Sequence, residues 1–143
     1  MSKITKSALA TSLKKLLSQK ELTKISVSCR EDYKIKMKII TLCGNLKFQK
    51  EMMTVAEKMA LEGYCILTPV YPVSKDIERT KEQLIKLKEA HFKRIELSDA
   101  ILVVNINNYI GESTKLEMDY AKKLGKEIIY YTDLIENKQS NKL

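Results

Sequence analysis

Tryptophan is absent from this sequence of 143 residues, and proline, cysteine and glycine are scarce, at two, three and four copies. No stretch approaches the roughly 20 apolar residues that a membrane-spanning helix requires, so we expect no membrane segment. The lysine-flanked segment 1–15 lacks the apolar centre of a signal peptide. These absences predict a cytoplasmic protein.

The cysteines argue against two further classes of site. Cys29, Cys43 and Cys65 lie far apart, and the sequence contains no C-x-x-C pair. This spacing disfavours both a disulfide framework and a zinc site, so we expect no metal. Because Cys43 and Cys65 lie in apolar runs, they are predicted to be small buried residues.

The chain carries a formal net charge of +8, which can attract nucleic acid, phosphates or acidic surfaces. The lysines are not gathered in one patch, however. They alternate with glutamates, as in "ERTKEQLIKLKEAHFKRIE" at 78–96. This pattern indicates solvated helix faces.

Apolar runs and amphipathic segments alternate along most of the chain. The runs are 38–43, 64–69, 100–106 and 127–132, and the helical segments between them are 48–62, 78–97 and 114–124. Uniformly apolar strands are typical of a parallel sheet covered on both faces. We therefore predict an α/β, three-layer sandwich: a doubly wound, flavodoxin- or Rossmann-like parallel sheet of four to five strands. The predicted domain spans 37–134, with a helical appendage at 1–36 and a polar tail at 135–143.

Ligands of such sheets bind beyond the carboxyl ends of the strands. The segments 43–48, 68–73 and 105–114 should share that edge. Candidate binding residues there are Gly44, Asn45, Lys47, Phe48, Tyr71, Asn105, Tyr109, Gly111, Ser113 and Thr114. No G-x-G-x-x-G or P-loop pattern is present, so no dinucleotide fingerprint is supported.

Each group of candidates has an ordinary structural alternative. Asn45, Lys47 and Phe48 fit a site for an anion and an aromatic base, or a polar helix start with one buried aromatic residue. Tyr71 and Tyr109 fit stacking on a ring, or packing on a neighbouring loop. The sequence does not choose between these interpretations.

Glu117 lies on the face of its predicted helix that also carries Tyr120, Ala121 and Leu124. One interpretation is a capping box, in which Thr114 caps the helix and Glu117 reaches back to it. The other is a partly buried carboxylate that acts as nucleophile or base. The position of Glu117 on the apolar stripe favours the second.

His91 is the only histidine, and it shares a helical stripe with Leu84, Leu87 and Ile95. A lone histidine on an apolar stripe fits a core residue. That interpretation is favoured over a site residue near the 105–114 loop, although the geometry of the helix does not decide.

Three stretches together resemble the nucleoside 2-deoxyribosyltransferase superfamily, which includes nucleotide N-glycosidases. They are "CGNLKF" (43–48), "HFKRIELSDAILVVN" (91–105) and "GESTKLEMDYA" (111–121). The resemblance implies cleavage or transfer of an N-glycosidic bond with retention, with Glu117 as nucleophile. It also implies a nucleoside or nucleotide substrate, no cofactor, and a homo-oligomer of two or more chains.

The sequence departs from that family at two places. His91 stands eight residues before Asp99, where the family usually has an aspartate, and Ser113 and Lys115 stand where small residues are common. His91 is then a candidate acid or sugar-orienting group. The alternative function is a catalytically inactive nucleotide-sensing module. The base, the sugar, the 5′ group and the choice between transfer and hydrolysis stay open.

Segment 4–28 resembles the first helix of a TetR-type regulator. The chain then enters the sheet domain without room for a recognition helix, and a first helix alone does not read a major groove. A DNA-binding regulator is therefore the least favoured alternative. Residues 1–36 are predicted to pack on the domain or on a partner chain.

Overall fold

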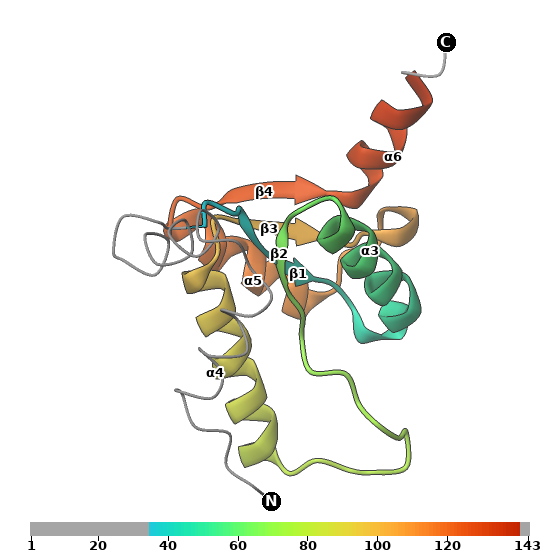
Figure 1. The fold of residues 1–143 in the computed structure, drawn as a ribbon. Helices are drawn as coiled ribbons and strands as arrows, with labels where there is room; N and C mark the ends of the chain where they lie inside the picture. The colour runs from blue at the N-terminus through green and yellow to red at the C-terminus, as the bar shows by residue number, and fades with distance from the viewer. Residues whose placement is uncertain (1–34, 141–143) are drawn as a thin grey trace, which may run out of the picture. The chain divides into compact units, whose positions relative to one another are not determined.

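A computed structural model describes residues 35–140 (Figure 1). The predicted appendage at 1–36 therefore lies almost wholly outside the described residues. Four parallel strands form one sheet in the order β2-β1-β3-β4. The strands are β1 (Ile39–Cys43), β2 (Cys65–Leu67), β3 (Ala100–Val103) and β4 (Glu127–Tyr130). The predicted doubly wound α/β fold is confirmed, with four strands.

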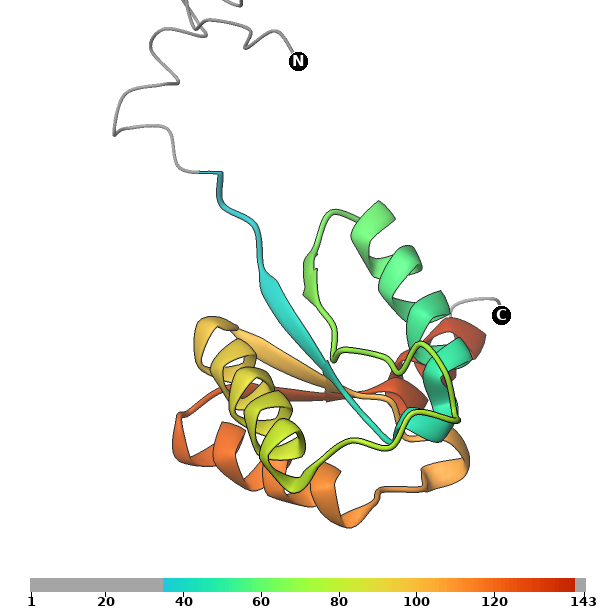
Figure 2. The same ribbon diagram turned by 90° about the horizontal axis from the view of Figure 1, so that it is seen from below.

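Helices cover the two faces of the sheet, as Figures 1 and 2 show together. The helices are α3 (Gln49–Leu61), α4 (Lys81–Leu97), α5 (Glu112–Lys123) and α6 (Tyr131–Ser140), with short 3₁₀ turns η1 (Leu46–Phe48) and η2 (Ile106–Asn108). Ile40, Leu42 and Leu102 point into the core shared with α3. Cys43, Ile101 and Val103 point into the core shared with α4 and α5.

The strand order reverses beside β1. The chain runs from β1 outward to β2, then crosses back to β3 on the other side of β1. Cys43 at the end of β1 pairs with Val103 at the end of β3. Such a reversal leaves a crevice at the carboxyl ends of the two strands, where ligands of this fold class bind. Because side chains alternate along a strand, Cys43 faces the α4 and α5 side.

The C-terminal end differs from the prediction. The strand predicted to reach residue 132 ends at Tyr130, and α6 begins at Tyr131. The predicted polar tail at 135–143 is helical as far as Ser140, and Leu134 packs on the core beneath it. Asn105 supplies the physical reason. Its side-chain oxygen accepts a hydrogen bond from the Thr132 backbone N–H (3.3 Å), and its amide donates to the Thr132 hydroxyl (3.1 Å). Asn105 thus satisfies one backbone N–H group in the first turn of α6.

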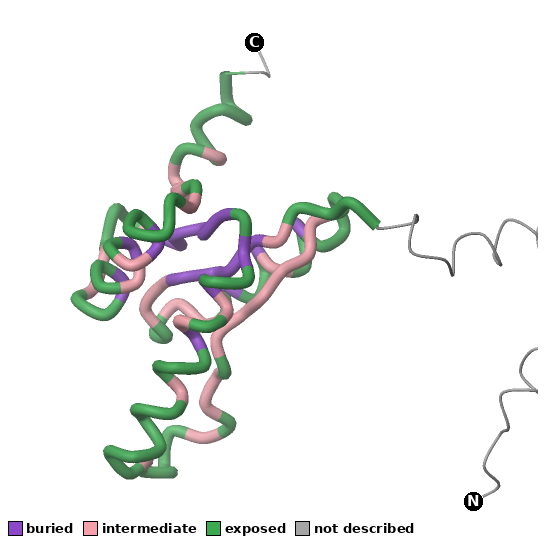
Figure 3. Tube along the Cα trace, turned by 90° about the vertical axis from the view of Figure 1, so that its left-hand side faces the viewer, coloured by how far each residue is buried: buried purple, intermediate pink, exposed green. Residues whose placement is uncertain are grey.

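The first half of α4 extends away from the sheet together with the loop before it (Figure 3). Every residue from 81 to 90 is exposed except Leu87, which is half-buried. Only from His91 onward does α4 pack on the sheet, with Ile95 fully buried. Within residues 35–140, no helix combines the length and apolarity needed to cross a bilayer.

Candidate active site

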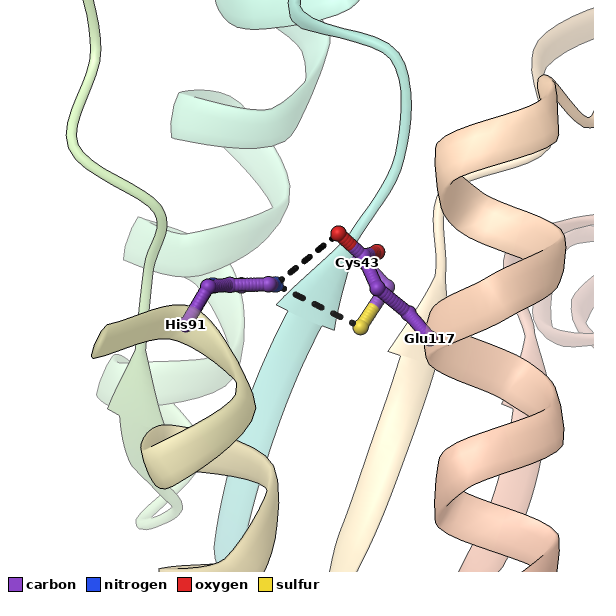
Figure 4. Close-up of side chains that lie close together, drawn as sticks. All are labelled: Cys43, His91 and Glu117. Carbon is purple, nitrogen blue, oxygen red and sulfur yellow. Dashed lines mark hydrogen bonds and ion pairs between the residues drawn. The ribbon is translucent and has the colours of Figure 1, made fainter. Parts of the chain in front are cut away.

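Three side chains from three elements meet below the crevice: Cys43, His91 and Glu117 (Figure 4). The His91 Nε2 atom lies 3.6 Å from Glu117 Oε1 and 3.7 Å from Cys43 Sγ. The side chains of His91 and Glu117 are 9% and 15% exposed, so both groups are largely removed from water. The second oxygen of Glu117 and Nδ1 of His91 are buried without a hydrogen-bond partner among the described residues.

The start of α5 shows whether Glu117 can cap the helix. The helix begins at Glu112 with Gly111 as its N-cap, so Thr114 is already inside the helix and 2% exposed. Glu117 lies in the second turn and has no free N-terminal N–H group within reach. The capping-box interpretation is therefore wrong, and Glu117 points inward beside Met118 and Ala121.

Above the three side chains is a cleft of about 570 Å³. Its walls come from the turn after β1, the loop after β2, α4, and the start of α5. The lining residues are Gly44, Asn45, Leu46, Pro69, Val70, Arg79, Leu84, Leu87, Lys88, His91, Phe92, Arg94, Tyr109, Gly111, Glu112, Ser113, Thr114 and Glu117. Cys43 lies below its floor and is fully buried.

Eight of the residues singled out from the sequence meet in this cleft. They are Glu117, His91, Gly44, Asn45, Tyr109, Gly111, Ser113 and Thr114. Gly44 is tightly enclosed, since a Cβ there would lie 3.3 Å from the backbone oxygen of Val104. The absence of a side chain at residue 44 therefore lets the turn pack against the end of β3.

Lys47 and Phe48 do not line the cleft. The Lys47 ammonium lies 3.5 Å from the centre of the Tyr109 ring, and the Phe48 ring meets that of Tyr109 edge to face at 6.0 Å. The backbone N–H of Lys47 donates to Asn45 Oδ1 (2.9 Å). The two side chains support the cleft wall through Tyr109, and Phe48 is half-buried there, not buried as the ordinary alternative predicts.

Tyr71 and Asn105 are also outside the cleft. Tyr71 packs on the opposite core with α3, where burial raises the pKa of its phenol. Asn105 is 5% exposed and bonded to Thr132. Both were grouped with the site because their segments end at the binding edge, but each side chain points elsewhere.

The sequence interpretation missed the cations of the cleft. Arg79, Lys88 and Arg94 line it, and none forms an ion pair with a carboxylate of residues 35–140. Lys88 and Arg94 lie on α4, whose charge pattern in the sequence indicates a solvated face, and Arg79 lies in the loop just before this helix. One sequence signal pointed to these cations: Lys88 lies next to the helical stripe of Leu84, Leu87 and His91. That stripe extends beyond the sheet, and there it lines the cleft.

Burial moves the pKa values of the two titratable groups in opposite directions. Burial raises the pKa of Glu117 to about 7, a rise that Cys43 and Lys88 reduce. Burial lowers the pKa of His91 to about 4, and Arg94 adds to that shift. Burial also raises the pKa of the Cys43 thiol well above its usual range. Between about pH 4 and 7 the Glu117–His91 pair holds one proton and carries no net charge.

Comparison with known proteins identifies similar folds. No protein-family model matches the sequence, and no curated protein is a significant match. Among solved structures, a 2-deoxyribosyltransferase from Leishmania mexicana is similar at 20% identity and a TM-score of 0.49, over 66% of this chain and 63% of that protein. The CMP N-glycosidase BcmB from Clostridium botulinum is similar at 18% identity and a TM-score of 0.42, over 65% of this chain and 70% of that protein.

The buried carboxyl predicts how stability depends on pH. Glu117 has an ordinary pKa of 4.5 in the unfolded chain and about 7 in the fold. A raised carboxyl pKa favours the fold below pH 4.5, and that advantage is lost as pH rises from 4.5 through 7. The Glu117→Gln variant lacks this loss. We expect it to exceed the parent protein in stability by on the order of 3 kcal/mol at pH 8, and by less than about 1 kcal/mol at pH 5.

Urea unfolding at the two pH values measures this difference, and Asp119→Asn, an exposed carboxylate on the same helix, is the matched control. An equal effect of pH on the parent and on Glu117→Gln would show that the Glu117 carboxyl is not destabilised by burial.

Proposed function

We propose that this protein cleaves the N-glycosidic bond of a nucleoside monophosphate, with Glu117 as the nucleophile and His91 as the acid. The observation that carries the proposal is the pairing of a buried carboxyl with a buried imidazole, 3.6 Å apart, on the floor of a cleft at the switch point of the sheet. The sequence resemblance of segments 91–105 and 111–121 supports the same chemistry.

The reaction has two steps with retention at the anomeric carbon. In the first, a Glu117 oxygen attacks C1′, the C1′–N bond breaks, and the departing base nitrogen takes the proton from His91 Nε2. In the second, water attacks C1′ of the glycosyl ester, His91 accepts the proton of that water, and the Glu117 carboxylate leaves. A second base in place of water gives transfer instead of hydrolysis.

The proton for the first step is already in the site. Between about pH 4 and 7 the pair holds one proton, which rests on Glu117 because burial disfavours both charges. Moving that proton across the contact to His91 produces the carboxylate nucleophile and the imidazolium acid together. A single buried proton therefore prepares both groups.

The sugar must enter between the two groups. Acid and nucleophile lie roughly 5–5.5 Å apart in retaining glycosidases. The contact between His91 and Glu117 therefore opens by about 1.5–2 Å when substrate binds. Neither His91 Nδ1 nor the second oxygen of Glu117 is held by another described residue, so rotation of Glu117 breaks no hydrogen bond of these atoms, and rotation of His91 breaks only its contact with the Cys43 sulfur.

The cations of the cleft favour a phosphorylated substrate. Arg79 and Lys88 come from the protruding side of the cleft and have no carboxylate partner among residues 35–140. Guanidinium groups bind phosphate through parallel N–H bonds. We place the 5′-phosphate at Arg79 and the sugar over Glu117.

The protruding part of the chain supports the expected homo-oligomer. Val73 and Ile77 in the loop and Ile85 on α4 are 98%, 67% and 56% exposed. Exposed apolar side chains on a segment that borders a binding cleft fit a subunit interface. A second copy of the chain would cover them and close the cleft on that side.

The first functional prediction concerns the nucleophile. Glu117→Gln removes the attacking carboxylate, so we expect release of base from nucleoside monophosphates to fall at least several hundred-fold, roughly 4 kcal/mol of transition-state stabilisation. Chromatography of a panel of nucleosides and monophosphates in metal-free buffer measures the free base. The control Asp119→Asn should keep the parent rate.

A Glu117→Gln protein with the parent rate would exclude Glu117 as the nucleophile. Binding of monophosphates by the parent protein without any base release would instead identify a sensing module.

The second functional prediction concerns His91. In the parent protein, base release should be constant between about pH 4 and 7 and fall above about 7, where the pair loses its proton. In His91→Asn only the ionised Glu117 remains, so the rate should instead rise through the pKa of Glu117. The rate at pH 6 should fall by roughly 10²–10⁴.

Because His91 is the only histidine, its NMR titration gives its pKa without assignment, and we expect a value of about 4. A folded His91→Asn protein that keeps the alkaline decline would remove His91 from proton transfer.

The third functional prediction concerns the phosphate. We expect Arg79→Ala to raise KM for the monophosphate by roughly 10–100-fold, the loss of a charged hydrogen bond, and to leave KM for the matching nucleoside unchanged. Lys86→Ala is the matched control, since Lys86 lies on α4 close to Arg79 in the sequence, pairs with Glu82 and does not line the cleft. Equal changes in KM for both substrates would contradict a phosphate site at Arg79.

A further inference from the structure

Cys43, His91 and Glu117 are three kinds of metal ligand within one small volume. One donor atom from each lies within 4.8 Å of the others, and His91 Nε2 is the shared neighbour at 3.7 Å from sulfur and 3.6 Å from oxygen. The three side chains point toward one another in Figure 4. The cysteine spacing disfavours a zinc site whose ligands are close together in the sequence. Cys43 and His91 are 48 residues apart and are brought together by the fold.

The distances match those of a tetrahedral zinc site. With a Zn–S bond of about 2.3 Å and Zn–N and Zn–O bonds of about 2.0–2.1 Å, tetrahedral geometry places sulfur and nitrogen about 3.6 Å apart, and nitrogen and oxygen about 3.4 Å apart. The two distances to His91 Nε2 are each within about 0.2 Å of these values. Only the carboxylate has to rotate toward the sulfur.

The surroundings leave room for a fourth ligand. His91 and Glu117 line the cleft, while Cys43 lies below them, so a bound cation would have three protein ligands and one open position toward the cleft. Sites with three protein ligands and an open position are typical of zinc that binds water or substrate. The second oxygen of Glu117 is buried and has no hydrogen-bond partner among residues 35–140, so its lone pairs are free to bind a cation.

We propose that Cys43, His91 and Glu117 form a site for a thiophilic divalent cation of the zinc type, and that the bound cation shuts off base release. The binding half stands on the geometry alone, and the inhibitory half rests on the proposed function. Binding replaces the protons of the Cys43 thiol and the Glu117 carboxyl, which pass to solvent, and uses the lone pair of neutral His91. Glu117 then binds the cation and does not attack C1′.

Cobalt(II) titration of the full chain tests the binding half, because a thiolate ligand gives Co²⁺ a charge-transfer absorption that carboxylate and imidazole do not. The titrated protein is a variant with the substitutions Cys29→Ser and Cys65→Ser, so that Cys43 is its only thiol. We expect one Co²⁺ per chain, a charge-transfer band, and displacement by Zn²⁺. Adding Cys43→Ser should abolish the band and weaken Zn²⁺ binding at least 100-fold.

His91→Gln and Glu117→Gln provide independent tests should the Cys43 variant fail to fold, and each should weaken Zn²⁺ binding by at least tenfold. Absence of the band in the folded single-thiol protein, or undiminished Zn²⁺ binding in the folded ligand variants, would overturn the site.

The inhibitory half is tested by base release with Zn²⁺ added. One equivalent should stop the reaction, a chelator should restore it, and in the Cys43→Ser protein at least tenfold more Zn²⁺ should be needed. Base release without Co²⁺ binding overturns the metal site and leaves the proposed function standing. Co²⁺ binding without base release under metal-free conditions overturns the proposed function and the inhibitory half, and supports the metal site.

Discussion

The burial of one carboxyl group against one imidazole is the constraint on which the site depends. Water would stabilise the charged forms of both Glu117 and His91, but the cores under α4 and α5 remove it. The free energy is lowest when the pair stays neutral and shares a proton. Burial holds each group in a protonation state that water would not favour, and this lowers the stability of the fold. Such groups concentrate at functional sites.

The sheet makes this pairing possible. The reversal of strand order beside β1 places the end of β1 next to the end of β3, and the helix that follows β3 then returns over the same face. Cys43 is fixed by the strand, while Glu117 is carried by the helix. His91 arrives from α4, at the point where that helix first packs on the sheet. Three rigid elements thus hold the three groups without a flexible loop.

The same three side chains carry both proposals. Glu117 and His91 form a nucleophile and acid when they share a proton, and with Cys43 they form a ligand set when protons are replaced by a cation. The two states exclude each other, because one carboxylate oxygen cannot both attack a sugar and bind a metal. The cations Arg79 and Lys88 line the protruding side of the same cleft and are not part of the ligand set.

The sequence by itself determined the order of strands and helices as far as β4, without α6, and it determined the inward face of α5. Apolar runs and helical stripes depend on local spacing, so Ile101 in the core and Glu117 on the buried side follow from it. Periodicity shows which face of an element is covered, but not what covers it. Only the tertiary structure decided that His91 meets Glu117, that Cys43 lies beneath both, and that Asn105 bonds Thr132. Those contacts depend on strand register and helix packing, which join residues far apart in the chain.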